Sequence, residues 1–142
     1  KSLGTNDKQD ADVVWVFDMM KELGISQHNM CSCSVTGYGD FLFVATGNGF
    51  DESDPKWFVP EAASFICLNK KTGELLWQDK SPGLNILHGQ WSSPAVAEVG
   101  GVAQVLFAGG DGWLYSFKAN AGKDGKGELL WKFDCNPKDS KW

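Results

Sequence analysis

The residues best suited to chemistry are one histidine and two cysteines that lie close together, in the pattern His28-x-x-Cys31-x-Cys33. Thiolate and imidazole groups are ligands for zinc and copper, and two cysteines at positions i and i+2 share one face of a strand. The matching frame sixty residues later begins at His88 and contains no thiol. Cysteines at i and i+2 of a regular strand are also poorly placed for a disulfide. The pattern therefore favours cysteines buried in a strand over a metal or redox site.

Two further segments carry the residue types of binding loops. Residues 51–54 (DESD) are rich in carboxylates, but they lack the alternating acidic ladder and the glycine of a calcium-binding EF-hand loop. Gly37–Gly39 precedes an expected strand and not a helix, which excludes a dinucleotide-binding loop. No spacing in the chain assembles a Ser-His-Asp triad or a pair of carboxylates for acid–base catalysis. We therefore predict no catalytic and no metal-ligating residues.

Charge narrows the classes of partner. The 142 residues include 13 basic and 18 acidic side chains, and every basic one is lysine. A net charge of −5 has the wrong sign for binding nucleic acid or an anionic membrane surface, and bidentate recognition by arginine is absent. No apolar run reaches the roughly 18 residues of a membrane-spanning helix. The sequence predicts no nucleic-acid partner and no transmembrane segment.

An internal repeat organises these residues. Gly73–Trp77 (GELLW) recurs letter for letter at 127–131, and 13–17 (VVWVF) is a looser third copy centred on Trp15. Between them, the segment 28–33 aligns with 88–93, and 43–49 aligns with 106–112. Because the matches keep the same order, the chain contains two similar structural units.

Each unit is expected to form four short strands. Dense apolar runs predict second strands covered on both faces, and the alternation in 113–118 predicts a half-buried third strand. Asn48-Gly49 and Asp111-Gly112 predict type I′ hairpin turns. A single helical turn is expected between Asp18 and Gly24. The expected strands are 32–36, 41–46, 64–69 and 74–79, followed by 92–98, 104–108, 113–118 and 128–134.

Units of four antiparallel strands at this period are typical of β-propellers. The predicted fold class is all-β, a partial β-propeller of about two four-stranded antiparallel blades plus a leading strand. One tryptophan per unit would then pack into the adjacent blade. The expected organisation is a polar N-terminal segment (1–12), a leading strand with its connecting loop (13–31), blade one (32–79), a loop (80–91), blade two (92–134) and a C-terminal tail (135–142).

The segment 64–77 resembles the tryptophan-docking motif of the PQQ-like (quinoprotein-type) β-propeller repeats, usually written Ala-x-Asp-x-x-Thr-Gly-x-x-x-Trp. Cys67 and Asn69 stand where alanine and aspartate are usual, and the second copy has five extra residues before its tryptophan. The resemblance implies that one set of residues docks each blade to the next. This set is Trp15, Thr72, Gly73, Trp77, Gly122 and Trp131.

One histidine lies just before the first strand of each unit. The inner strands of a propeller begin near its central channel. We therefore predict that His28, His88, Gln90 and Trp91 face the channel, where they could contact a ligand. The alternative is that each histidine caps a loop or bonds to the neighbouring blade.

The resemblance implies a non-catalytic scaffold or a protein- or ligand-binding surface in the bacterial periplasm or cell envelope. Two blades cannot close a ring, so the expected partners are the remaining blades of a longer propeller, a second copy or another protein. The alternative is a fragment of a PQQ-dependent alcohol or sugar dehydrogenase, with pyrroloquinoline quinone and calcium as cofactors. Such enzymes carry adjacent cysteines, calcium ligands of Glu and Asn type and a catalytic aspartate. Here a serine separates Cys31 from Cys33, and no matching calcium set can be assigned.

Overall fold

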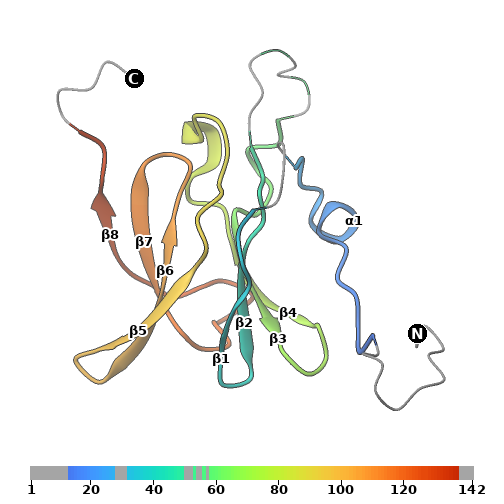
Figure 1. Cartoon of the computed structure of the whole chain (residues 1–142), viewed down its shortest axis with the longest axis vertical. Helices are drawn as coiled ribbons and strands as arrows, with labels where there is room; N and C mark the ends of the chain where they lie inside the picture. The colour runs from blue at the N-terminus through green and yellow to red at the C-terminus, as the bar shows by residue number, and fades with distance from the viewer. Residues whose placement is uncertain (1–12, 28–31, 50–52, 54–55, 57, 138–142) are drawn as a thin grey trace.

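The computed structural model describes residues 13–27, 32–49, 53, 56 and 58–137, and these form two antiparallel sheets of four strands each (Figure 1). In both sheets the strands follow one another in chain order. A helix, α1 (Met19–Leu23), and a 3-10 turn (Gly83–Asn85) are the helical elements of the described part. The predicted all-β class with two four-stranded blades is confirmed. The strands are β1 (Thr36–Tyr38), β2 (Phe41–Ala45), β3 (Phe65–Asn69), β4 (Leu75–Asp79), β5 (Ala95–Val99), β6 (Val102–Ala108), β7 (Trp113–Lys118) and β8 (Leu129–Asp134).

The first strand lies later than predicted, at 36–38 and not at 32–36. Tyr38 pairs with Phe41, so a two-residue turn joins β1 to β2, and Gly39 supplies its positive φ of 57°. This turn determines the register. Just before β1, Ser34 N donates to Ser93 Oγ (2.8 Å), in the segment leading into β5. Thr36, the first residue of β1, donates from its Oγ1 to the carbonyl oxygen of Pro94 in the same segment (2.6 Å).

The predicted type I′ turns are both wrong. Asn48-Gly49 lies within the long connection between β2 and β3, and Asn48 is fully buried there. Asp111-Gly112 belongs to the four-residue connection 109–112, in which Gly112 has a φ of 78° but Asp111 has no positive φ. The connection is closed by Gly109 N, which donates to Trp113 O (2.8 Å). A four-residue loop needs only one left-handed residue, whereas a type I′ turn needs two.

Residues 13–17 do not form the expected leading strand. Their exposure still alternates, since Val14 and Val16 are 79% and 81% exposed while Trp15 and Phe17 pack on the first sheet. The side chains of this segment contact the face of the first sheet. Its backbone does not pair with an edge strand, so the segment forms no strand. The helical turn that follows is as predicted: the Asp18 side chain accepts from Lys21 N, and Gly24 ends the helix with a φ of 64°.

The main core lies between the two sheets. Phe65 of β3 stacks on Phe107 of β6 with ring centroids 4.6 Å apart, and both are essentially unexposed. A second cluster covers the other face of the first sheet, where Ile66 and Leu68 pack beneath Trp15 and α1. Strands β2 and β3 are therefore buried on both faces, which explains their continuous apolar sequence.

The strand register places the two sheets on the same plan. In the first sheet Phe43, Cys67 and Trp77 lie side by side across β2, β3 and β4. The matching row in the second sheet is Leu106, Ser116 and Trp131. Each sheet also has an irregularity directly after the middle residue of its row. The sequence repeat is thus a repeat of structure, down to the position of a β-bulge.

Removal of the central ring should show how far stability depends on packing between the sheets. We expect Phe65→Ala to lower the free energy of unfolding by about 3–5 kcal/mol, because it empties a fully buried aromatic site. Val14→Ala, at a residue 79% exposed, should change it by less than about 0.5 kcal/mol. Urea unfolding followed by tryptophan fluorescence measures both. Similar losses in the two variants would contradict a core located between the sheets.

Candidate functional site

Three loops meet at one end of the two sheets. They are the described residues 46–49, 53, 56 and 58–64 after β2, residues 80–94 after β4 and residues 109–112 after β6. In Figure 1 the loop after β4 rises above the sheets, and β8 ends at the same side. Loops held by a rigid scaffold are the usual place for binding residues. This loop end also contains the histidine-tryptophan region that the sequence singles out.

Gln90 links the two sheets at this loop end. Its Nε2 donates to the carbonyl oxygen of Asn48 (3.0 Å), and its Oε1 accepts from Gly110 N (3.4 Å). Asn48 in turn donates to Val59 O (2.9 Å) and accepts from Ser26 N (3.2 Å). Gln90 is only 2% exposed, which corrects the prediction that it faces a channel. An amide can satisfy one acceptor and one donor of the backbone at once, and here that capacity joins neighbouring loops.

His88 and Trp91 flank Gln90 and remain exposed. Their rings lie edge to face with centroids 5.4 Å apart, and Trp91 is 42% exposed. Gly89 lies directly beneath the indole, because a Cβ added there would be 2.5 Å from two of its ring atoms. The structure therefore brings together two of the four predicted channel residues as a surface aromatic pair. The fourth, His28, lies outside the described residues.

A buried carboxylate that the sequence reasoning missed supports the same loop end. Asp111 is 7% exposed, and its Oδ2 accepts from the Tyr115 hydroxyl (2.5 Å). Burial, together with this hydrogen bond to Asp111, raises the pKa of Tyr115. Asn136 Nδ2 donates to the backbone carbonyl of Asp111 (3.1 Å), which ties the segment after β8 to the loop. The only sequence signal was an acidic residue inside a glycine-rich turn.

The cysteines do not form a reactive centre in the described part of the chain. Cys33 Sγ donates to Ala45 O (2.9 Å), and the side chain packs against the main core. Burial raises the pKa of Cys67 to about 12, so it is a thiol at neutral pH. Cys31 lies outside the described residues. Among the residues that are described, no three His, Cys, Asp or Glu side chains converge to hold a metal ion.

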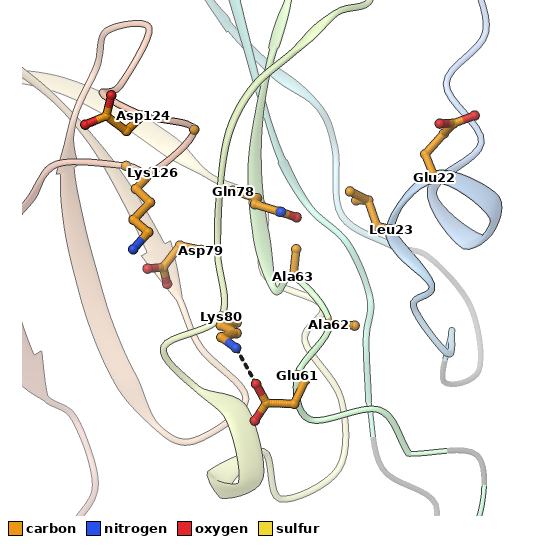
Figure 2. Close-up of a pocket in the computed structure, with 12 residues that line it drawn as sticks. Glu22, Leu23, Glu61, Ala62, Ala63, Gln78, Asp79, Lys80, Asp124 and Lys126 are labelled. Atoms are coloured by element: carbon orange, nitrogen blue, oxygen red, sulfur yellow. Dashed lines mark hydrogen bonds and ion pairs between the residues drawn. The ribbon is translucent and has the colours of Figure 1, made fainter.

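A cavity of about 660 Å³ opens beside β4, where Glu61–Ala63 and Lys80 from two of the three loops also line it. Figure 2 shows Glu22 and Leu23 of α1 on one side of it and Asp124 with Lys126 on the other. The second side is the β7–β8 connection, which bonds to the strand through Gln78 N and Gly125 O (3.1 Å). Its described lining includes no histidine, cysteine or serine. The cavity is a mixed-charge cleft built by four separate segments, so no single sequence motif predicts it.

The expected docking residue Trp77 is fully buried between the sheets. Its Nε1 donates to the carbonyl oxygen of Asn120, in the turn between β7 and β8 (2.9 Å). Its ring lies against Gly122, where an added Cβ would be 2.6 Å from Trp77 Cδ1. Gly127 meets the other end of the ring, at 3.0 Å by the same measure. The two glycines of the longer second turn thus share one indole.

Trp15 makes the same kind of contact one sheet earlier. Its Nε1 donates to the carbonyl oxygen of Lys70, in the turn between β3 and β4 (3.0 Å). Its ring lies against Gly73, where an added Cβ would be 2.6 Å from Trp15 Cδ2. Gly73 and Gly122 also share a left-handed backbone, with φ of 73° and 70°. Each indole therefore bonds to one turn carbonyl and stacks on one turn glycine.

Asn69 and Thr72 shape the first of these turns. Asn69 Oδ1 accepts from Lys71 N (2.9 Å) and from Thr72 N (3.1 Å). Thr72 Oγ1 accepts from Glu74 N (3.3 Å). Such side-chain bonds replace backbone ones in Asx and ST turns, and an asparagine serves as well as an aspartate. The departure from the repeat motif at position 69 therefore leaves the turn intact.

Trp131 differs from the other two tryptophans. It is 41% exposed, and its Nε1 donates to Gln104 Oε1 in its own sheet (2.9 Å). The same oxygen accepts from Ser116 Oγ (2.7 Å). Trp131 thus occupies the sheet position of Trp77 without a neighbouring turn to receive it.

No protein-family model matches this chain, and a search of curated proteins finds no match. Within the described residues, no helix combines the length and the apolar character needed to cross a bilayer. What the molecule does must therefore be inferred from its own contacts.

The Gln90 link can be tested directly. Gln90→Ala leaves Asn48 O and Gly110 N buried without partners, so we expect the free energy of unfolding to fall by about 1–3 kcal/mol. His88→Ala, two residues away on the surface, should change it by less than about 0.5 kcal/mol. Urea unfolding gives both values, and hydrogen exchange should be faster at the Gly110 amide only in the first variant. Unchanged exchange at Gly110 would contradict the link.

Proposed function

We propose that this chain is a module of a β-propeller of the PQQ-like repeat type and acts as a non-catalytic scaffold. The observation that supports this best is the repeated contact between a tryptophan and a glycine turn. Trp15 meets the turn of the first sheet, and Trp77 meets the turn of the second, with the same donor atom and the same left-handed glycine. In stacked repeat proteins each unit contacts its neighbour in the same way, so the same contact recurs once per unit.

Further blades are the first class of partner in this proposal. The outer strand β8 exposes Trp131 and Phe133 on one face, at 41% and 63%. In the first sheet the tryptophan in the same row is completely covered. Contiguous apolar surface of this kind marks an interaction site. Additional blades, in a longer chain or in another molecule, would cover it.

The loop end is the proposed binding surface for a protein or ligand. His88 and Trp91 form an exposed aromatic pair on a backbone that the buried Gln90 holds in place. Tryptophan is over-represented at the centres of protein interfaces, and a rigid support lowers the entropy lost on binding. Location in the bacterial periplasm or cell envelope is part of this proposal and depends on the repeat resemblance alone.

Two glycines of the same loop test the docking contact with matched backbones. Gly122 and Gly125 have φ of 70° and 71°, but a Cβ at Gly122 would collide with the carbonyl oxygen of Lys126 (2.5 Å) and with Trp77 Cδ1 (2.6 Å), whereas one at Gly125 would meet nothing within 4 Å. Both alanine variants bear the strain of a left-handed residue, about 1 kcal/mol. We expect Gly122→Ala to lose about 1–3 kcal/mol more in urea unfolding, because it also displaces the indole and the turn carbonyl beside it. Equal losses would argue against docking at this glycine.

The non-catalytic assignment is tested with the cofactors of the alternative. The purified chain is incubated with pyrroloquinoline quinone and calcium, and reduction of an electron-accepting dye is measured with ethanol or glucose. We expect no reduction above that of quinone and calcium alone, because the described residues bring together no calcium donor set. Dye reduction that depends on the protein would contradict the scaffold assignment and favour the dehydrogenase.

A further inference from the structure

Each sheet has two unlike faces, which are best compared row by row. The tryptophan face carries the tryptophan of the sheet's own outer strand. The receiving face lies opposite and includes the β-turn glycine that accepts a tryptophan from elsewhere. In the first sheet the receiving face contains Val44, Ile66 and Leu68, and in the second it contains Val105, Phe107, Tyr115 and Phe117.

Both receiving faces are covered within the molecule. The second sheet's face is covered by the first sheet, with Trp77 at its turn. The first sheet's face is covered by Trp15, Phe17 and helix α1. This cover is slight, because the helix has five residues and residues 13–17 belong to no strand.

The two tryptophan faces differ in their cover. Trp77 is 0% exposed, whereas Trp131, in the same row of the second sheet, is 41% exposed. Phe133 on the same strand is 63% exposed. The indole Nε1 of Trp131 donates to Gln104 Oε1, within its own sheet.

A complement to this bare face exists in the same chain. The first sheet's receiving turn matches the second in its glycine φ (73° and 70°) and in its carbonyl acceptor, Lys70 O in place of Asn120 O. One molecule therefore holds both halves of a head-to-tail contact. Its receiving half is filled by Trp15, whose segment 13–17 belongs to no strand.

We propose that the tryptophan face of the second sheet docks on the receiving face of the first sheet in a second copy of this chain, with Trp131 replacing Trp15. The inference rests on the proposed propeller function and names a partner for it. Trp131 Nε1 would exchange Gln104 Oε1 for Lys70 O, while Gln104 keeps its bond from Ser116. No buried polar group loses its last partner in this exchange.

The contact is heterologous, so its repetition closes a ring when the rotation per copy permits. Each copy contributes two sheets, and propellers close with about four to eight blades, which corresponds to roughly two to four copies. The surfaces that meet are the counterparts of the pair already in contact inside the chain, one tryptophan face and one receiving face. The stacking geometry is therefore available without any new type of contact.

Light scattering during size-exclusion chromatography of the whole chain, over a range of concentrations, tests the proposal. We expect a concentration-dependent species of two to four copies. Trp131→Ala should raise the dissociation constant at least about tenfold, as for a central tryptophan of an interface. Leu129→Ala is the matched control, since Leu129 is 45% exposed and pairs with Phe117, which lies on the opposite face of the second sheet. Trp15→Ala should strengthen assembly, because it frees the receiving face.

A mixing experiment identifies the two halves of the contact. Gly73→Ala blocks the receiving turn, as its Cβ would lie 2.6 Å from the position of the docked ring, and far-UV circular dichroism checks that this variant folds. Neither Trp131→Ala nor Gly73→Ala should assemble alone. Mixed together they should form a one-to-one heterodimer, since one retains the receiving face and the other retains the tryptophan.

Three results would overturn the proposal. They are a monomer at every concentration, assembly that Trp131→Ala leaves unchanged, and assembly that Trp15→Ala does not strengthen, which would mean another acceptor. The proposed propeller function fails separately, when Gly122→Ala and Gly125→Ala are equally destabilising. A monomeric chain in which these two variants still differ would reject the second copy as partner and retain the propeller module.

Discussion

An indole ring held against a glycine turn is the contact on which the rest of this structure depends. The turn glycine has no Cβ, so the ring approaches the backbone where any other residue would collide with it. The same indole donates its N–H to a carbonyl of that turn, at 2.9 Å for Trp77 and 3.0 Å for Trp15. Burial of a large apolar surface and satisfaction of a polar group are thereby combined in one side chain. Because the contact joins the outer strand of one sheet to a turn of the next, it determines how the sheets stack.

A contact of this kind is directional, and its direction explains both proposals. Every sheet receives a tryptophan on one face and supplies one from the other, so a stack of two sheets keeps one tryptophan to spare. That tryptophan is Trp131, and it is the most exposed of the three that share this plan. At the loop end the same stacking brings Asn48 and Gly110 within reach of the Gln90 amide. The proposed scaffold and its proposed binding surface thus both depend on one packing arrangement.

The sequence by itself determined the repeat, most of the strands and the single helix. Six of the eight strands lie within two residues of their predicted ends, because alternation and apolar runs are properties of neighbouring residues. The N-cap Asp18 and the terminating Gly24 are likewise local signals, and they act as predicted. Trp77 could be singled out in advance because its segment is repeated almost unchanged at Trp131. The sequence also suggested the same structural role for Trp77 and Trp131, since identical segments are expected to lie in identical environments.

Only the tertiary structure decided which of those surroundings exist. Trp77 is buried and Trp131 is exposed, although their segments are identical, because a second sheet covers one and no described residue covers the other in the same way. Asn48 was predicted in a hairpin and is instead a buried link, since its partners come from distant loops. For the same reason, the sequence did not predict that Gln90 is buried or that Asp111 accepts a hydrogen bond from the Tyr115 hydroxyl. A hydrogen-bond partner far along the chain leaves no trace in local pattern, so such placements become visible only when the sheets are packed together.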